Sequence, residues 1–484
     1  MPRPINILFV SSEARPLIKT GGLADVSSSL PAALRDLGLD CRLLLPGYPS
    51  VLERCIALTP VANIAAPADT PVQLLLGQMP DTHVPVYVLD APHAFQRPGG
   101  PYQDASGTEH PDNAERFALL SRIAAQLCDP HSALAKQTHW HPDCLHCNDW
   151  QTGLAPAYLH YAGRPIPSLT TIHNLAFQGV YDPDILPRLG LPAESFAIHG
   201  LEYYGSIAFL KAGLFYSDWI TTVSPTYALE IQAEPLGMGM QGLLQQRSHQ
   251  LTGILNGIDT ADWNPSSDLH LAHNYTYRGM AGKRRSKTAL QTELGLNKDA
   301  AAPLFGIVSR LTHQKGLDWV VQAVDGILAQ GGQLAILGTG EPELEVRFKQ
   351  LAQQHPHSVA AFIGYDEGRS HRIEAGADIF LMPSRFEPCG LNQMYSQRYG
   401  TLPLVRTTGG LADSVTDGKD GFSFAGDTAH ALWLTIERAL AIYHDPKAWR
   451  RMQQTAMRKD MSWEHSAREY VALYTQLIAA THSS

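Results

Sequence analysis

The stretch "INILFVSSEARPLIKTGGLADV", residues 5–26, decides the fold that the sequence predicts. It begins with an apolar run typical of a buried strand. The segment "KTGGLADV", residues 19–26, then supplies a cation, a hydroxyl, two glycines and a helix start. Glycines permit close backbone approach, and a helix N-terminus offers unpaired N–H groups and the positive end of a dipole. The stretch therefore predicts a strand, a loop suited to an anion, and a helix.

Similar apolar runs recur along the chain, separated by segments compatible with helices. They are INILFV, CRLLLP, PVYVLD, SLTTIHN and WITTVS before residue 225, and LFGIVSR, GQLAILG, AAFIGY, DIFLMPS and LPLVRT after residue 300. Runs without polar alternation suit parallel strands that are covered on both faces. We therefore expect two doubly wound α/β domains with ligands at the carboxyl ends of the strands. Residues 251–265 are the expected seam, and residues 462–480 have the apolar spacing of an amphipathic helix.

Composition excludes several classes of partner. The 484 residues include 37 basic and 46 acidic side chains, a net charge of -9, which argues against nucleic acid or an anionic membrane as partner. No run approaches the roughly 20 apolar residues of a membrane span, and the start of the chain lacks the pattern of a signal peptide. We therefore expect a cytoplasmic protein. Its six scattered cysteines are expected to be reduced thiols.

Two short patterns suggest a metal, and both have a simpler interpretation. Cys144 and Cys147 have the C-x-x-C spacing of a zinc site, but no second ligand pair at comparable spacing follows. Asp182 and Asp184 have the D-x-D spacing of some sugar transferases, but a proline separates them and the segment reads as a turn entering a helix. We therefore predict no metal site.

Two loops of the second half carry further anion chemistry. In "SRLTHQKG", residues 309–316, Arg310 and Lys315 follow a strand and could converge on a diphosphate. The alternative interpretation is that Arg310 and Lys315 are two solvated surface charges with no ligand. The segment "RTTGGLADSV", residues 406–415, repeats the hydroxyls, glycine pair and helix start of the opening stretch. Two such loops in two α/β domains predict a ligand that both domains hold.

A third cluster combines an acid with a helix start. In "PSRFEPCGLNQMY", residues 383–395, Glu387 lies in a turn ahead of Cys389, and Gly390 and Leu391 begin a helix with free N–H groups. The carboxylate can accept hydrogen bonds from sugar hydroxyls, while the N–H groups can donate to phosphate. This pairing predicts a site for a phosphorylated sugar.

Taken together, these segments resemble a known family. KTGGLADV, HNLAFQG, ILNGID, SRLTHQKG, SRFEPCGLNQMYSQRYG and TTGGLADSV are similar, in order from Lys19 to Val415, to the signature segments of bacterial glycogen synthases and plant starch synthases. The resemblance implies a GT-B fold, in which two Rossmann-like domains face a deep interdomain cleft. The expected parts are residues 1–253, residues 254–460, and a C-terminal helix in residues 461–484 that crosses back to the first domain.

The resemblance also implies roles for individual residues. The expected catalytic residues are Lys19, His173, Arg310, Lys315 and Glu387. The donor would be bound by Lys19, Gly21, Gly22, Asp25, Asn256, Tyr365, Cys389, Gly390, Leu391, Thr408, Gly409 and Gly410. Within these sets Arg310 and Lys315 resemble the pyrophosphate clamp, and Tyr365 resembles the aromatic residue against adenine. Asp149 is expected on the acceptor side or in the cleft. Two positions depart from the family pattern: Asn148 replaces a histidine, and Asn392 replaces a hydroxyl or branched residue.

The implied reaction is transfer of glucose from ADP-glucose to the nonreducing 4-hydroxyl of an α-1,4-glucan such as glycogen, with retention and release of ADP. Fixed charges can stabilise the departing phosphate, so neither a metal nor pyridoxal phosphate is expected. UDP-glucose as donor, a phosphorylase that uses pyridoxal phosphate, and a noncatalytic glycan-binding protein stay open as alternatives. A dehydrogenase is disfavoured because "GTGEPE", residues 338–343, lacks the third glycine of the dinucleotide fingerprint.

Overall fold

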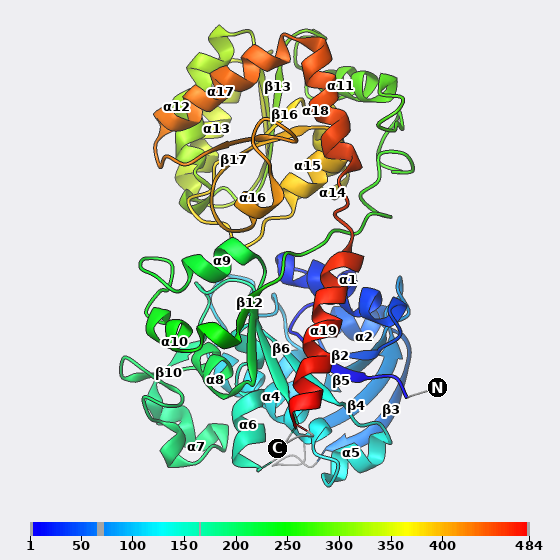
Figure 1. Ribbon diagram of the computed structural model, residues 1–484, viewed down its shortest axis with the longest axis vertical. Coiled ribbons are helices and arrows are strands. Elements are labelled where there is room, and N and C mark those ends of the chain that lie inside the picture. Colours follow the sequence, from blue (N-terminus) through cyan, green and yellow to red (C-terminus); the bar gives the residue numbers. More distant parts are fainter. Residues whose placement is uncertain (1–2, 65–71, 164–165, 482–484) are drawn as a thin grey trace. The chain divides into compact units, whose positions relative to one another are not determined.

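The computed structural model describes residues 3–64, 72–163 and 166–481 (Figure 1). Two units divide the chain, each with its own sheet and flanking helices. The first consists of Met1–Val223, Ala228–Asn256 and Trp463–Ser484, and the second of Ser224–Tyr227 and Gly257–Ser462. Within the described ranges, no helix combines the length and apolar character needed to cross a membrane.

The first unit is built on a nine-stranded sheet in the order β12-β11-β7-β6-β1-β2-β5-β4-β3. The strands are β1 (Asn6–Val10), β2 (Asp40–Pro46), β3 (Ile56–Ile64), β4 (Val72–Gln78), β5 (Pro85–Asp90), β6 (Cys144–Asn148), β7 (Ser168–Ile172), β11 (Trp219–Thr222) and β12 (Leu251–Gly253). A small separate sheet contains β8 (Val180–Tyr181), β10 (Ser206–Ala208) and β9 (Glu202–Tyr203). β1 pairs in parallel with β2 and β6, so the opening stretch lies at the centre of the sheet.

The helices of the first unit surround this sheet. They are α1 (Gly22–Asp36), α2 (Pro49–Arg54), α3 (Pro92–Phe95), α4 (Asn113–Cys128), α5 (Ala133–Thr138), α6 (Ala155–Tyr161), α7 (Leu186–Leu189), α8 (Phe209–Tyr216), α10 (Gln241–Gln246) and α19 (Trp463–Thr481). α9 (Pro225–Glu230) spans the division between the units. The strand, loop and helix predicted for residues 5–26 are confirmed as β1, its following loop and α1.

Two strands that were not predicted, β3 and β4, make one edge of this sheet antiparallel. β4 pairs antiparallel with both β3 and β5. Only residues 79–84 join β4 to β5, too few for the crossover connection that a parallel pair requires. β3 is also largely exposed, as suits an edge strand with one solvated side.

β6 explains the cysteine spacing that suggested zinc. Cys144 and Cys147 are both buried inside this strand. Residues three apart on a strand point to opposite faces of the sheet, so the two thiols cannot share an ion there. Between them, His146 is buried and both its ring nitrogens are bonded, Nδ1 to the Tyr474 hydroxyl at 2.6 Å and Nε2 to Thr171 Oγ1 at 2.7 Å. The segment is therefore part of the core.

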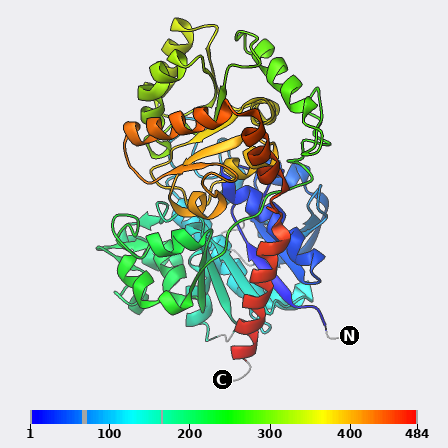
Figure 2. The same cartoon turned by 45° about the horizontal axis from the view of Figure 1, so that its top comes forward.

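The C-terminal helix α19 belongs to the first unit, although the second unit precedes it in sequence. It packs against α1 and β6, and both views show it beside α1 (Figures 1 and 2). Its buried residues recur at helical spacing, which confirms the predicted amphipathic helix. The second unit is thus inserted into the first. Its incoming and outgoing segments lie side by side, because the Ile258 N–H donates to the Met461 carbonyl at 2.8 Å.

The second unit is built on six parallel strands in the order β15-β14-β13-β16-β17-β18. They are β13 (Leu304–Val308), β14 (Gln333–Gly338), β15 (Val359–Ile363), β16 (Ile379–Met382), β17 (Leu402–Arg406) and β18 (Phe422–Phe424). This is the strand order of the dinucleotide-binding fold, in which the direction of winding reverses between the first and fourth strands. Here the reversal falls between β13 and β16.

Helices cover both faces of the second sheet. α12 (Leu317–Ala329), α13 (Pro342–Gln354), α17 (Ala429–Tyr443) and α18 (Pro446–Arg458) enclose the larger apolar core. α11 (Ala281–Glu293), α14 (Glu367–Gly376) and α16 (Gly409–Ser414) enclose the smaller one, and α15 (Asn392–Arg398) follows β16. Burial on both faces explains why these strands read as continuous apolar runs.

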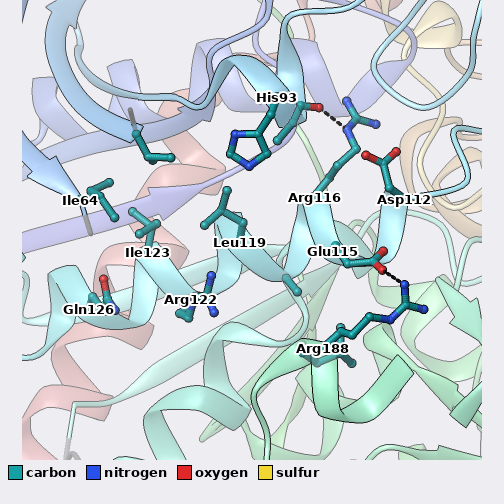
Figure 3. A pocket seen from close by; sticks show the side chains of 14 residues that line it. Ile64, His93, Asp112, Glu115, Arg116, Leu119, Arg122, Ile123, Gln126 and Arg188 are labelled. Carbon is teal, nitrogen blue, oxygen red and sulfur yellow. Dashed lines mark hydrogen bonds and ion pairs between the residues drawn. The ribbon is translucent and has the colours of Figure 1, made fainter. Parts of the chain in front are cut away.

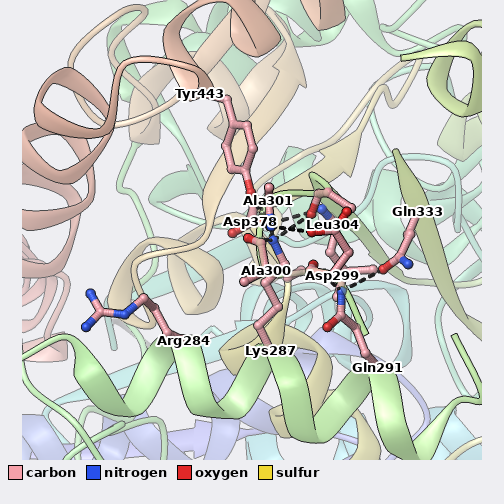
Figure 4. A network of polar contacts seen from close by, with 12 residues as sticks. Arg284, Lys287, Gln291, Asp299, Ala300, Ala301, Leu304, Gln333, Asp378 and Tyr443 are labelled. Carbon is pink, nitrogen blue, oxygen red and sulfur yellow. Dashed lines mark hydrogen bonds and ion pairs between the residues drawn. The ribbon is translucent and has the colours of Figure 1, made fainter. Parts of the chain in front are cut away.

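A buried polar network fixes the edge of this sheet where the strands begin (Figure 4). The Lys287 ammonium lies 2.7 Å from Asp378 Oδ2 and also donates to the Tyr443 hydroxyl at 2.9 Å. Asp378 in turn accepts from the Leu304 N–H at 2.9 Å, which ties α11 to the start of β13. Removing one member of such a buried pair costs about 3–5 kcal/mol. The network therefore stabilises the edge opposite the carboxyl ends of the strands.

Candidate active site

In the first unit the candidate site lies at the carboxyl ends of β1 and β6, the two neighbouring strands between which the direction of winding reverses. Successive strands run outward from β1 on one side and from β6 on the other, so the loops after these two strands flank a switch point. Asn148, at the end of β6, donates from Nδ2 to the Val10 carbonyl at the end of β1, at 2.9 Å. This hydrogen bond fixes the two loops relative to each other.

The loop after β1 is organised by Glu13, which the sequence interpretation missed. Glu13 is buried, and its carboxylate accepts hydrogen bonds from the Thr20 N–H, from Thr20 Oγ1 at 2.5 Å and from the Tyr102 hydroxyl at 2.5 Å. The Gly21 N–H also points to it at 3.4 Å. The only feature of the sequence that could have indicated this role is the position of Glu13, an acid three residues after the buried strand β1. Its partner Tyr102 is too far away in sequence to predict.

Lys19 and Asp25, predicted as neighbours, are brought together. The Lys19 ammonium lies 2.8 Å from Asp25 Oδ1, and Arg15 Nε lies 3.8 Å from the same oxygen. The Lys19 side chain is 35% exposed, so its charge is held at the surface of the loop. Asp25 therefore orients a cation that solvent or a ligand can reach.

The glycine pair of this loop has no requirement for glycine within the described protein. Gly21 has an extended backbone with φ of −153°, and a Cβ added at Gly21 or Gly22 would meet nothing within 4 Å. Neither conformation nor internal packing explains two glycines here. Open space beside the backbone is what a closely approaching ligand needs.

The buried Asp149 and the partly buried His173 form a second group in this unit. Asp149 Oδ1 accepts from the His173 N–H at 2.7 Å. Burial raises the pKa of Asp149 to about 7, although N–H groups of His173 and Asn174 oppose the shift. Burial lowers the pKa of His173 to about 3, so its imidazole is neutral at physiological pH.

Asn148, expected from the resemblance to depart from the family pattern, sets the tautomer of His173. Because Asn148 Nδ2 donates to the Val10 carbonyl, Asn148 Oδ1 is the acceptor in its 2.9 Å hydrogen bond with His173, and His173 Nε2–H is the donor. His173 Nδ1 is left with a lone pair. Asn148 thus orients the imidazole of His173.

In the second unit the candidate site lies at the reversal between β13 and β16. The Lys315 ammonium forms an ion pair with Glu387 Oε2, and Ser384 Oγ donates to the same oxygen at 3.0 Å. Only 16% of the Lys315 side chain and 9% of the Glu387 side chain are exposed. Gly316 brings the two loops into contact, because a Cβ there would lie 2.1 Å from the Pro383 carbonyl oxygen. Two clusters predicted separately therefore meet.

The second glycine pair differs from the first. Gly409 has φ of +43°, and a Cβ there would lie 2.0 Å from the Glu387 carbonyl oxygen. A Cβ on Gly410 would lie 2.3 Å from the Cys389 carbonyl oxygen, and its N–H donates to the carbonyls of Glu387 and Pro388 at 3.2 and 3.1 Å. Glycine is needed here so that α16 can pack on the Glu387 loop.

The other predicted residues of the second unit lie in loops that follow its strands or where its helices start. Arg310 is exposed in the loop after β13, and Tyr365 is 74% exposed in the loop after β15. Cys389 is buried, Gly390 has φ of +70°, and Leu391 immediately precedes α15; Thr408 is buried at the start of α16. Asn392 donates from Nδ2 to the Val308 carbonyl at 2.6 Å, which ties α15 to the end of β13.

The predicted residues thus fall into two sets. Lys19, Gly21, Gly22, Asp25, Asp149, His173 and Asn256 belong to the first unit, and the others to the second. Asn256 is buried, and its Oδ1 has no hydrogen-bond partner among the described residues. Asp182 accepts from the Asp184 N–H at 2.9 Å and caps a short 3₁₀ turn before α7, which confirms the predicted turn.

A cavity of about 450 Å³ in the first unit lies apart from these residues (Figure 3). α4 contributes Glu115 and Arg122 to its lining, and Arg188 of α7 pairs with Glu115 at 2.6 Å. None of the predicted site residues lines it. This cavity is therefore not the candidate active site, despite its size.

Comparisons with known proteins cover nearly the whole chain. Residues 6–246 match the family model of the starch synthase catalytic domain, and residues 293–458 match glycosyl transferases group 1. Glycogen synthase of Nitrosomonas europaea is 51% identical over 98% of both chains, and that of Dechloromonas aromatica is 51% identical over 98% of this chain and 99% of its own. The catalytic domain of starch synthase IV from Arabidopsis thaliana, solved with ADP and acarbose, is 32% identical with a TM-score of 0.89 over 98% of this chain and 100% of its own.

Proposed function

The chain belongs to the glycogen synthase family, and from that premise we propose that it transfers glucose from ADP-glucose to the nonreducing 4-hydroxyl of an α-1,4-glucan, with retention and release of ADP. The family resemblance inferred from the sequence motifs is confirmed, and so is the GT-B class of fold with its two α/β units. The enzyme is a glycosyltransferase of glycogen biosynthesis.

The observation that carries the proposal is the ion pair of Lys315 and Glu387 at the switch point of the second sheet. Ligands of doubly wound sheets bind at this position. A nucleotide sugar presents a diphosphate and sugar hydroxyls side by side, and the pair presents a cation and a carboxylate side by side. The related starch synthase IV structure, described as bound to ADP and acarbose, supports the same class of ligands.

We propose that fixed cations stabilise the leaving group. Negative charge develops on the β-phosphate of the donor as its bond to the anomeric carbon breaks. Arg310 and Lys315 would lie against the diphosphate, and Lys19, oriented by Asp25, would add a third positive charge. With these charges in place, the proposed step requires no metal and no pyridoxal phosphate.

We propose that Glu387 and His173 hold the donor glucose. Glu387 Oε2 is engaged by Lys315 and Ser384, an arrangement that suits binding of a sugar hydroxyl better than nucleophilic attack. His173 is neutral and has a lone pair at Nδ1, so it can accept from another hydroxyl. In the proposed route the acceptor attacks from the face that ADP leaves, and the departing phosphate oxygen takes the acceptor proton.

The remaining assignments are proposals of the same kind. Tyr365 would stack on adenine, and Asn256 would use its buried Oδ1 toward the donor glucose. The backbone of Gly21 and Gly22 would approach the donor, where open space is available. Thr408, Gly409 and Gly410 would act mainly by fixing the loop that contains Glu387, Cys389, Gly390 and Leu391. Asp149 would line the acceptor side.

The decisive experiment compares initial rates with ADP-glucose and UDP-glucose on one glycogen primer. We expect faster transfer from ADP-glucose, and equal or reversed rates would overturn the donor assignment. Absence of turnover with either donor would favour a glycan-binding protein. An absorbance band of bound pyridoxal phosphate, together with phosphate-dependent breakdown of glycogen, would favour a phosphorylase.

A further inference from the structure

One buried imidazole in the second unit has a ring nitrogen that no contact explains. His371, on α14, is 1% exposed, and its Nδ1 lies 2.8 Å from Asp268 Oδ2. Asp268 also accepts hydrogen bonds from the His270 N–H at 2.8 Å and from the Tyr399 hydroxyl at 2.5 Å. Asp268 is therefore an acceptor, and His371 carries its proton on Nδ1. His371 Nε2 is left with a lone pair, is buried, and has no partner among the described residues.

Two carboxylates lie beside this imidazole. Glu367 precedes His371 by one turn of α14, a spacing that places both side chains on one face of the helix. Asp262 comes from the segment before α11. One donor atom from each of the three residues lies within 4.8 Å of the others. Because Nδ1 is engaged by Asp268, the nitrogen available to this group is Nε2.

The separation of these donors is close to that around a single ion. Zinc binds nitrogen and oxygen at about 2.0–2.2 Å in tetrahedral geometry, so two of its ligands lie about 3.3–3.6 Å apart, somewhat closer than the 4.8 Å limit of this group. Small side-chain rotations would close the group from its present spacing. Both carboxylates are accessible to solvent, which provides a route of entry.

The surroundings of His371 are those of a metal ligand. Metal-bound histidines usually donate their other ring N–H to a carboxylate, which Asp268 supplies here. The ring also stacks on Trp263, with centroids 3.8 Å apart and planes at 13°, so its orientation is fixed. The nearby cations Arg369 and Arg372 are paired with Glu293, at 3.3 and 2.7 Å.

We propose that Asp262, Glu367 and His371 form a binding site for a divalent transition-metal ion, with Zn²⁺ as the ion that suits one imidazole and two carboxylates. The site is distinct from the Lys315–Glu387 ion pair, since α14 follows the loop of Tyr365 after the edge strand β15, while Lys315 and Glu387 lie between β13 and β16. A bound ion would join the start of α14 to the segment that contains Trp263. It would thereby stabilise the second unit.

The test is calorimetric titration of ZnCl₂ into the full chain after treatment with EDTA and removal of the chelator. We expect one site per chain with micromolar or tighter affinity, and a rise in melting temperature on adding Zn²⁺. Asp262→Asn and Glu367→Gln keep the side-chain size but remove an anionic ligand, so each should weaken binding at least tenfold. His371→Gln should abolish it, and the visible absorption of bound Co²⁺ should be lost with it.

The matched control is Glu437→Gln, which alters an exposed acid on α17 and should bind Zn²⁺ as the wild type does. Melting curves without metal establish that each variant is folded. If His371→Gln is unfolded, the two carboxylate variants decide the question. Wild-type affinity in both of them, or no binding of Zn²⁺ by the wild type at millimolar concentration, would overturn the proposed site.

Discussion

The ammonium of Lys315 and the carboxylate of Glu387 form an ion pair between two loops of the second unit, although the residues are 72 positions apart in the sequence. Each charge is largely removed from solvent. The pair therefore holds both loops at the switch point in a defined geometry, and changing either residue alters the environment of the other.

Glu387→Gln should lower kcat by about a hundredfold, because it removes the negative acceptor proposed for the reacting glucose. The variant should be folded at the assay temperature, which circular dichroism will verify. kcat/KM should fall with kcat, since the contact is proposed to strengthen in the transition state. Glu343→Gln, on the exposed first turn of α13, is the matched control and should be fully active. A loss confined to KM would indicate uniform substrate binding and contradict the role.

The two glycine pairs should respond differently to alanine. Gly22→Ala should leave the melting temperature nearly unchanged, because nothing lies within 4 Å of the added Cβ, but should lower activity at least tenfold by obstructing the donor. Gly410→Ala should destabilise the protein by about 1–3 kcal/mol or more, because its Cβ would collide with the Cys389 backbone. Thermal denaturation and initial rates measure both effects. A strongly destabilised Gly22→Ala would refute the ligand-based explanation for the first pair.

Lys19→Ala should weaken transfer while Lys19→Arg retains part of it, because the proposed contribution is mainly electrostatic. A unit charge about 4 Å from the diphosphate is worth about 1–4 kcal/mol, or roughly fivefold to a thousandfold in kcat/KM. Steady-state rates at several salt concentrations provide the measurement. Equal rates for the wild type and Lys19→Ala at low salt would exclude Lys19 from the donor site.

The buried carboxyl of Asp149 should make stability depend on pH. Its folded pKa of about 7 lies above the ordinary value of 3.8, so the folded chain binds more protons than the unfolded chain between these values. This contribution is present at low pH and is lost as pH rises through 7. Relative to Asp149→Asn, the wild type should lose about 2–3 kcal/mol of unfolding free energy between pH 5 and pH 8. Urea denaturation of both proteins tests this, and a constant difference would show that Asp149 is ionised throughout.

Chelation should leave the transfer rate unchanged. Arg310, Lys315 and Lys19 supply the charge proposed for the leaving group, and the proposed zinc site lies elsewhere in the second unit. Release of ADP should be measured before and after exhaustive EDTA treatment, at a temperature where the chelated protein is folded. Activity that disappears and returns with Mg²⁺ or Zn²⁺ would contradict the metal-free step and direct attention to Asp182 and Asp184.

Much of the fold could be predicted because parallel strands that are buried on both faces have uninterrupted apolar sequences. β13 and β14 are examples. β6 was missed because His146 and Asn148 make it look polar, and both are satisfied by partners distant in sequence. β3 was missed because an exposed edge strand has no such run.

The candidate site was predictable where its chemistry is local. Lys19 with Asp25, and the loop of Glu387, are recognisable within a few residues. The Glu13 carboxylate and the orienting role of Asn148 were not, because each depends on contacts that only the folded chain provides. Glu13 meets Tyr102 across 89 positions, and Asn148 meets Val10 across 138. The two glycine pairs have the same local sequence, but packing requires glycine only at Gly409 and Gly410.

The insertion of the second unit has a consequence for how the chain is synthesised. β1 and β6 leave the ribosome before the second unit, but α19, which covers β6 and α1, is made only after the whole second unit. Domains commonly fold in order from the N-terminus during synthesis. Here the first unit to appear is the last to be completed, and until then the surface that α19 will bury is open to nonspecific association. A chain ending at residue 462 should accordingly be digested rapidly within β6 and α1, while residues 257–462 resist protease.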